Sequence, residues 1–360
     1  MTADLTRAPG AAGPDAAPEG VSDAGMFAVL GVLSNAMTAT MLDLGRRTGL
    51  NAALAAGPAE VTELAARAGG DPRITAEWLH ALVTAGLVTA ADGQYAWIPP
   101  AAAAFGAPAG SPQDLSAGVE LFSVLSGCVP LVADAFGAGG GVPAERYPGD
   151  LATAMQRMSV GWTAQVLPYV WVPAVPGLTD RLAAGGAIAE IGSGAGEALE
   201  ALVRTFPAAT ATGFELDARG VRAGSERLAA AGLADRVRLL EQDAATGLSG
   251  PYDLVLALSV LHDVPDLDRM LAAIAASLAP DGVLLVVESP ALSGPMAGLL
   301  LATSTLYCVP STLARGGPAA GTLGLPPSVL VPAAARAGLA PVAPLPNPVP
   351  LVHATAFRRA

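Results

Sequence analysis

Residues 187–217 read AIAEIGSGAGEALEALVRTFPAATATGFELD, and this stretch contains the pattern that indicates the fold. An apolar run carrying Glu190 leads into a glycine-rich turn, a segment of helical periodicity and a second apolar run that ends at Glu215. The order predicts strand, loop, helix and strand, which is the nucleoside-holding half of a Rossmann-like unit. Glu215 is then placed to accept hydrogen bonds from two ribose hydroxyls.

The spacing of the glycines separates two kinds of nucleotide site. Gly192, Gly194 and Gly196 form G-x-G-x-G followed at once by Glu197, whereas the dinucleotide fingerprint is G-x-G-x-x-G and seats a pyrophosphate on a helix N-terminus. An acid at the helix start repels phosphates, and Glu190 suits the ammonium group of an amino-acid-bearing nucleoside better. S-adenosylmethionine is such a nucleoside. Taken alone, the glycines also fit an ordinary tight turn.

Three further apolar runs follow the opening unit. Strands are expected in residues 234–247 with an end at Asp243, in residues 253–262 with an end at His262, and in residues 281–289. Helical periodicity covers residues 220–233 and 267–278 between them, so a parallel sheet with right-handed crossovers is predicted. Ligands of such sheets bind at the carboxyl ends of the strands, where Glu190, Glu215, Asp243 and His262 fall.

Five motifs in this order, EIGSGAG, GFELD, EQDA, LSVLHDVPD and DGVLLVVE, resemble those of class I S-adenosylmethionine-dependent methyltransferases over residues 178–360. The resemblance implies an α/β fold with a Rossmann-like seven-stranded methyltransferase sheet, and S-adenosyl-L-methionine as the cofactor. The cofactor-binding residues it implies are Glu190, Gly192, Gly194, Gly196, Glu215, Asp243, Ala244 and Ser259. Among them the glycines line the methionine part, Glu215 holds the ribose, and Asp243 holds the adenine amino group with Ala244 beside it.

The front of the chain predicts a second, smaller domain. Residues 44–105 read as a helix, a segment TELA, a helix on residues 73–85 and a polar ribbon around Asp92-Gly93, which together predict a winged helix-turn-helix. The segment is similar to the small domain that precedes the catalytic domain in small-molecule O-methyltransferases and in actinobacterial winged-helix methyltransferases of unassigned substrate. Residues 304–324 resemble the latter group.

We therefore expect an N-terminal all-helical or winged-helix domain joined to the methyltransferase domain through helices. The expected parts are a disordered tail in 1–21, a winged-helix dimerisation domain in 22–105, a helical linker and lid in 106–177, and the class I domain in 178–360.

Charge argues against DNA as the partner of the winged helix. Between Arg46 and Asp92 the chain has arginines 46, 47, 67 and 73 against acids 60, 63, 71, 77 and 92, and the whole chain has a net charge of -12. Phosphate neutralisation needs a basic face. We expect no nucleic-acid partner and, as the resemblance implies, a homodimer formed through this domain.

The predicted catalytic residues are His262 and Glu288. Methyl transfer from a sulfonium mainly requires alignment, with a base to take the proton of a hydroxyl or phenol. In resembling O-methyltransferases the histidine of an L-H-D segment is that base, and an acid at the place of Glu288 orients it. No second flanking acid is evident, a structural role for His262 remains an alternative, and no metal site is expected.

The acceptor pocket is expected between the lid and the segment after the fifth strand. Aromatic and Met side chains there suit a small, neutral aromatic or polyketide-like metabolite. The candidate pocket residues are Met155, Met158, Trp162, Tyr169, Thr303 and Tyr307.

Membrane and secretory signals are not expected. The uncharged stretches 158–179, 289–314 and 337–357 are long enough to span a bilayer, but prolines interrupt each of them. Cys128 and Cys308 form no C-x-x-C motif, so the reducing cytoplasm is the expected compartment.

The sequence thus predicts a methyltransferase of secondary metabolism that methylates a hydroxyl or phenol of a small natural-product-like molecule by in-line transfer, with His262 as base. A C- or N-methyltransferase, or another cofactor-assisted reaction on the same fold, is one alternative. A cofactor-sensing winged-helix DNA-binding regulator is the other.

Overall fold

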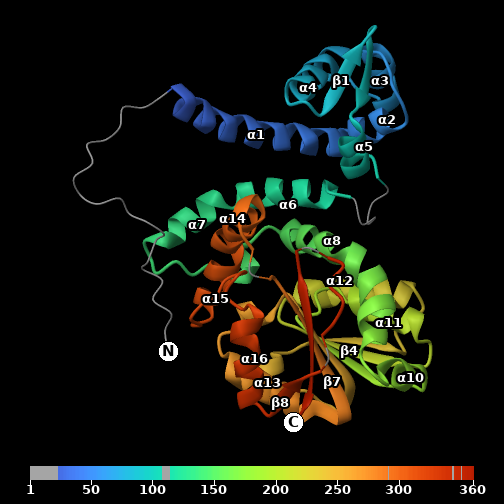
Figure 1. The fold of residues 1–360 in the computed structure, drawn as a ribbon, viewed down its shortest axis with the longest axis vertical. Helices are drawn as coiled ribbons and strands as arrows, with labels where there is room; N and C mark the ends of the chain where they lie inside the picture. Colours follow the sequence, from blue (N-terminus) through green and yellow to red (C-terminus); the bar gives the residue numbers. More distant parts are fainter. Residues whose placement is uncertain (1–22, 108–113, 291, 343, 350) are drawn as a thin grey trace. The chain divides into compact units, whose positions relative to one another are not determined.

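The computed structural model describes residues 23–107, 114–290, 292–342, 344–349 and 351–360 (Figure 1). The chain divides into two compact units, residues 1–106 and 107–360. The expected tail in 1–21 and most of the expected linker in 106–114 lie outside the described residues. The helices expected to form a separate linker and lid belong to the same compact unit as the sheet.

The first unit is a winged helix-turn-helix. Its elements are α1 (Asp23–Thr48), α2 (Leu50–Ala55), α3 (Val61–Ala68), α4 (Pro72–Thr84), β1 (Val88–Ala91), β2 (Gln94–Trp97) and α5 (Pro99–Phe105). Asp71 accepts the Ile74 N–H at 2.9 Å and so caps α4. Trp78 of α4 meets Trp97 of the ribbon edge-on, with ring centroids 6.0 Å apart. These contacts join helix and wing as the sequence predicted.

The second unit begins with helices that precede the sheet. They are α6 (Ser116–Gly127), α7 (Val129–Phe136), a 3-10 turn η1 (Ala144–Arg146), α8 (Gly149–Val166), a π-helical turn η2 (Leu167–Trp171), α9 (Val172–Ala174) and α10 (Leu178–Ala183). The lid helix expected over 150–167 is therefore α8.

Seven strands form one sheet in the order β5-β4-β3-β6-β7-β9-β8. The strands are β3 (Ala187–Ile191), β4 (Thr210–Glu215), β5 (Val237–Glu241), β6 (Tyr252–Leu258), β7 (Leu278–Glu288), β8 (Leu339–Pro341) and β9 (His353–Arg359). The pairs from β5 through β7 are parallel, and β9 is antiparallel to both β7 and β8. The predicted Rossmann-like, seven-stranded α/β sheet is confirmed.

Two strand ends differ from the sequence prediction. β5 ends at Glu241 and β6 ends at Leu258, so Asp243 and His262 lie beyond the strands rather than in them. Each of them belongs to a short 3-10 turn, η3 (Ala244–Thr246), which Asp243 caps, and η4 (Leu261–Asp263). Apolar residues continue past both strands, and periodicity does not show where strand pairing stops.

Helices cover both faces of the sheet. The remaining helical elements after β3 are α11 (Glu197–Thr205), α12 (Ala218–Ala230), α13 (Leu267–Ser277), α14 (Gly294–Thr303), a π-helical turn η5 (Ser304–Cys308), α15 (Val309–Ala314) and α16 (Pro327–Arg336), of which η5 packs against the helices that precede the sheet. Figure 1 shows α13 and α16 on one side of the sheet and α10 and α11 on the other. Successive strand residues alternate between the two resulting cores, with Leu254 and Leu256 in one and Val255 in the other.

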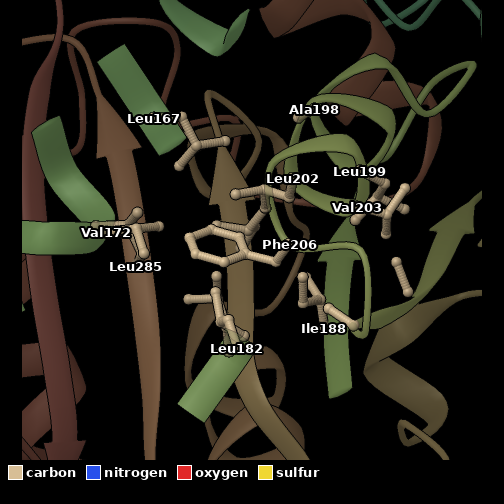
Figure 2. Packing of buried hydrophobic residues seen from close by; sticks show 14 of the residues in the cluster. Leu167, Val172, Leu182, Ile188, Ala198, Leu199, Leu202, Val203, Phe206 and Leu285 are labelled. Carbon is tan, nitrogen blue, oxygen red and sulfur yellow. The ribbon is translucent and has the colours of Figure 1, made fainter. Parts of the chain in front are cut away.

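The core on the α11 side anchors the strand before the glycine loop. Figure 2 shows Phe206 beside Leu202 and Leu182, with Ile188 of β3 nearby. At the opposite end of β3, Asp253 accepts the Ala187 N–H at 2.9 Å and pairs with Arg181 at 3.2 Å. Apolar packing thus holds one face of β3, and the interactions of Asp253 with Ala187 and Arg181 hold the start of the strand. Together they fix the position of β3 and so of the glycine loop that follows it.

By length and apolar composition alone, two helical segments of the described chain are long enough to cross a membrane, Gly25–Thr48 and Met296–Ala314, and the bent pair α6 and α7 would make a third. The sequence argument against the stretch 289–314 was incomplete, because Pro295 stands in the first turn of α14, where it does not break a helix. Leu300, Thr303 and Tyr307 of this segment line an internal cavity of the second unit.

Candidate active site

A cavity of about 2270 Å³ opens at the carboxyl ends of the parallel strands. Single-ligand pockets usually measure roughly 300–1,000 Å³, so this one has room for a cofactor and an acceptor together. Its lining includes most of the predicted cofactor residues, namely Glu190, Gly192, Gly194, Glu215, Asp243, Ala244 and Ser259.

The loop after β3 requires glycine for steric reasons. Gly192 has φ +63°, and a β-carbon there would lie 2.6 Å from Val260 Cγ2. Gly196 has φ +81° and does not line the cavity; a β-carbon on it would press on Leu239 at 3.1 Å. Gly196 is the N-cap of α11, where its positive φ allows the chain to enter the helix, and its expected ligand role stays a prediction.

Glu215 is fixed at the rim of the cavity by backbone donors. Its carboxylate accepts N–H groups from Gly194 at 2.8 Å, Leu216 at 2.7 Å and Asp217 at 2.9 Å. A carboxylate has about four lone-pair sites, so capacity remains for a ligand hydroxyl. The interaction with Gly194 also couples the acid at the end of β4 to the glycine loop.

Glu190 is a buried carboxylate at the end of β3, with 4% of its surface exposed. Its Oε2 has no hydrogen-bond partner among the residues that the structure describes. Burial raises the pKa of Glu190 well above its usual range, and the nearby carboxylates of Glu197 and Glu215 raise it further. An unpartnered acidic oxygen beside two further acids favours a cationic ligand group, which the ammonium of S-adenosylmethionine provides.

The remaining cofactor candidates lie after β5 and β6. Asp243 Oδ1 accepts the Ala245 N–H at 2.9 Å, which orients the carboxylate, and Ala244 beside it is buried. Ser259 has φ +52° and donates its N–H to Val287 O at 2.7 Å. Both turns present backbone and short side chains to the cavity.

His262 and Glu288 form a buried pair. His262 Nδ1 lies 2.6 Å from Glu288 Oε2, and Leu261 donates its N–H to Glu288 Oε1 at 2.8 Å. In the neutral ring Nδ1 therefore carries the proton, and Nε2 is left to act as an acceptor. Glu288 stands behind the ring and does not line the cavity, whereas His262 does.

Opposing effects act on the titration of His262. Burial lowers the pKa of its imidazole, but the Glu288 charge, hydrogen bonds with Cys308 and Glu288, and the Asp263 charge raise it, and the pKa lies well above its usual range. The environment therefore favours the imidazolium, the form that a base generates when it accepts a proton.

Two neighbours of His262 were not predicted as site residues. Asp263 Oδ1 lies 3.6 Å from His262 Nε2, and the buried thiol of Cys308 interacts with both. The only sequence signal was the adjacency of Asp263 to His262; Cys308 reaches the site from the π-helical turn η5.

The acceptor side of the cavity matches most of the prediction. Met155, Met158, Trp162, Thr303 and Tyr307 line it. Tyr169 does not: among the described residues it is 61% exposed and lies away from the cavity lining, so its assignment to the pocket is wrong. Tyr169 lies in the π-helical turn η2, which follows α8 directly and shifts the helical phase relative to the α8 residues that line the cavity.

Contacts that join α8, and the η1 turn before it, to the cofactor side were also missed. Gln156 of α8 donates to Glu197 at the start of α11. Arg219 of α12 donates to Tyr147 O at 3.5 Å and to Ala144 O at 3.3 Å. These contacts tie the segment over the pocket to the elements around the glycine loop, a long-range pairing that local patterns do not reveal.

The buried acid Glu190 makes stability depend on pH. Its folded-state pKa is raised, so between its ordinary value of 4.5 and the raised value the folded state keeps a proton that the unfolded chain releases. The free energy of unfolding of the cofactor-free protein should therefore fall as pH rises through this window. Glu190→Gln should make the fall shallower, as measured by urea unfolding between about pH 5 and pH 8.

Glu226→Gln, on the exposed surface of α12, serves as the control and should keep the wild-type slope. An unchanged slope in Glu190→Gln would contradict the assignment of a raised pKa to this residue.

Comparisons with known proteins agree with this geometry. A family model described as a methyltransferase domain matches residues 189–284, and one described as an Rv2258c-like winged HTH domain matches residues 36–106. An uncharacterized protein of Synechococcus, syc1184_c, is 35% identical over 100 residues, which are 27% of this chain and 24% of that protein. The match thus spans about a quarter of the relative's length.

Several solved structures share the fold over nearly the whole chain. The mitomycin 7-O-methyltransferase MmcR is 22% identical, with 94% of this chain and 98% of that chain covered and a TM-score of 0.67. Human N-acetylserotonin methyltransferase in complex with SAM is 20% identical, with coverages of 95% and 100% and a TM-score of 0.68. CalO1, a methyltransferase in calicheamicin biosynthesis with SAH bound, is 20% identical, with coverages of 94% and 98% and a TM-score of 0.66. The chain therefore combines an Rv2258c-like winged helix-turn-helix domain with a methyltransferase domain of the class I fold.

Proposed function

We propose that this protein is an S-adenosylmethionine-dependent methyltransferase that acts on a hydroxyl or phenol of a small natural-product-like molecule. The observation that carries the proposal is the buried His262–Glu288 pair, with 2.6 Å between Nδ1 and Oε2, in the wall of the cavity that also holds the acidic glycine loop. Cofactor-side residues and a base thus face one enclosed space.

The cofactor assignment is supported by the chemistry of the loop. Glu190 offers an unpartnered acidic oxygen, and Glu215 and Asp243 offer carboxylates that backbone donors orient. Solved structures of the same fold are described with SAM or SAH bound. When bound, S-adenosylmethionine supplies a methyl group on a sulfonium, which needs no further activation.

His262 is proposed to take the proton of the acceptor hydroxyl at Nε2. Glu288 fixes the ring by accepting the Nδ1 proton and stabilises the imidazolium that forms. Met155, Met158 and Trp162 of α8 enclose the acceptor region and exclude water from the reacting oxygen. An apolar, sulfur-rich and aromatic wall suits a neutral aromatic acceptor better than an anionic one.

The winged helix is proposed to bind a second copy of the chain rather than DNA. On α4, the only arginine, Arg73, pairs with Glu77 of the same helix, which leaves no basic face there. On α1, Met26, Leu30, Leu33 and Met37 are 49%, 50%, 61% and 61% exposed. Their spacing of four, three and four residues is that of a helix-pairing seam.

Cofactor binding can be tested without an acceptor. Calorimetry with S-adenosylmethionine should show one site per chain, and Glu215→Ala and Asp243→Ala should each weaken it roughly tenfold or more, since a hydrogen bond to a charged group contributes about 1.5–3 kcal/mol. Glu241→Ala is the matched control, because Glu241 is exposed and stands beside Glu215 in the register of β4 and β5. Wild-type-like affinity in both site variants, or no binding in the wild type, would refute the cofactor site.

The role of His262 can be tested by titration and by kinetics. NMR titration should give His262 a pKa above its ordinary 6.5 in the wild type and a lower one in Glu288→Gln, because the neutral amide no longer stabilises the imidazolium. With an acceptor found by screening hydroxylated aromatic compounds, kcat/KM should rise with pH through this pKa. His262→Ala should lower kcat by about 10²–10⁴-fold while S-adenosylmethionine still binds. Turnover that survives His262→Ala favours the alternative of C- or N-methylation.

The oligomeric state tests the role of α1. Sedimentation equilibrium should show a dimer for the wild type and a monomer for the double variant Leu30→Glu, Leu33→Glu, because two buried charges would face each other across the pairing seam. Ile74→Glu is the control, since Ile74 is an exposed apolar residue of α4 in the same unit. A monomeric wild type, or a dimer that survives the double variant, contradicts the proposal.

A further inference from the structure

A compact set of metal-ligating side chains lies in the cavity wall beside the proposed base. One ligand atom each from His262, Asp263 and Cys308 lies within 4.8 Å of the other two. His262 and Cys308 are buried, and Asp263 is mostly so. The sequence predicted no metal site, because Cys308 is distant in the chain and belongs to no ligand motif.

The separations are close to those of a tetrahedral zinc site. Zinc binds nitrogen and oxygen at about 2.0–2.2 Å and sulfur at about 2.3 Å, which places its ligand atoms roughly 3.5 Å apart. His262 Nε2 and Asp263 Oδ1 are already 3.6 Å apart. Cys308 Sγ lies within 4.8 Å of both other ligand atoms, so completing the set needs it to move inward by no more than about 1.3 Å. A thiolate with an imidazole selects zinc over magnesium or calcium.

Groups around the cluster are arranged as those around a metal-binding histidine usually are. Glu288 accepts the Nδ1 proton of His262, so Nε2 faces the cluster as an acceptor. Thr322 Oγ1 lies 3.2 Å from Cys308 Sγ. Asp263 Oδ1 is buried and has no hydrogen-bond partner in the part of the chain that the structure describes. An acidic oxygen left without a donor in such a place is itself an indication of a missing cation.

We propose that His262, Asp263 and Cys308 bind Zn²⁺ through Nε2, a carboxylate oxygen and Sγ, with the fourth coordination position open to the cavity. All three residues line that cavity. Binding releases the thiol proton of Cys308 to solvent, and the Nε2 proton of His262 wherever the imidazolium is present, because the thiolate and the neutral imidazole are the ligands. Zinc occupies the ring nitrogen that is proposed to take the proton of the acceptor, so bound zinc inhibits methyl transfer reversibly.

The site is tested directly with cobalt as a spectroscopic probe. Reduced, chelator-treated full-length protein should develop a near-ultraviolet thiolate-to-cobalt absorption band on titration with Co²⁺ alone, and Zn²⁺ should abolish the band by displacement. Cys308→Ser should lose the band, and Asp263→Asn should weaken Zn²⁺ binding at least about tenfold. The readout needs neither cofactor nor acceptor, so it stands or falls separately from the proposed activity.

The second cysteine provides the matched control. Cys128 is buried between α6 and α7, where its thiol donates to Val124 O at 3.4 Å, and it is not part of the ligand cluster, so Cys128→Ser should keep the cobalt band. Circular dichroism and S-adenosylmethionine binding check that each variant is folded. Absence of the band in folded wild-type protein, or its persistence in Cys308→Ser, would overturn the proposal. Turnover should be measured with and without micromolar Zn²⁺, and each variant compared with its own metal-free rate. Inhibition of the wild type but not of Cys308→Ser supports the inhibitory role.

Discussion

The reversal of strand order between β3 and β6 is the constraint on which the site depends. From β3 the chain adds β4 and β5 on one side of the sheet, and then returns to add β6 and β7 on the other. The loops after β3 and β6 must therefore part in opposite directions and leave a crevice between them. The glycine loop lies on one wall of this crevice and His262 on the other, although about 70 residues of sequence separate Gly192 from His262.

Several ionisable side chains are buried around that crevice, where their burial is unfavourable for folding. Glu190 is buried with an unpartnered oxygen, and the His262–Glu288 pair is buried with Asp263 beside it. Removing such groups from water costs free energy unless a partner offsets it. Hydrophobic packing on both faces of the sheet offsets the free-energy cost of burying these groups. The same groups are those that a cationic cofactor, a proton or a metal ion would partner.

Much of the fold was accessible from the sequence because its signals are local. The alternation of apolar runs with helical periodicity gave the α/β sheet, and the acids at the strand ends gave Glu190 and Glu215 as rim residues. Strand ends were less accessible: the apolar segment LSVLH continues beyond the last paired residue, so His262 was placed on a strand whereas it lies in a 3-10 turn. Tyr169 was assigned to the pocket from its residue type and its place in the lid segment, and neither shows that it lies in a π-helical turn with an exposed side chain.

The sequence by itself determined the domain order and the glycine loop, because both depend on residue types at short spacing. It also indicated the pairing of His262 with Glu288, because their spacing resembles that of the related O-methyltransferases. Only the tertiary structure decided which side chains surround His262. Cys308 lies in a π-helical turn and Thr322 in a loop, while Gln156 joins α8 and Arg219 joins the turn before α8 to the cofactor side. Contacts of this kind depend on how the packed elements meet in space. The local pattern of residues does not predict which distant segments come together.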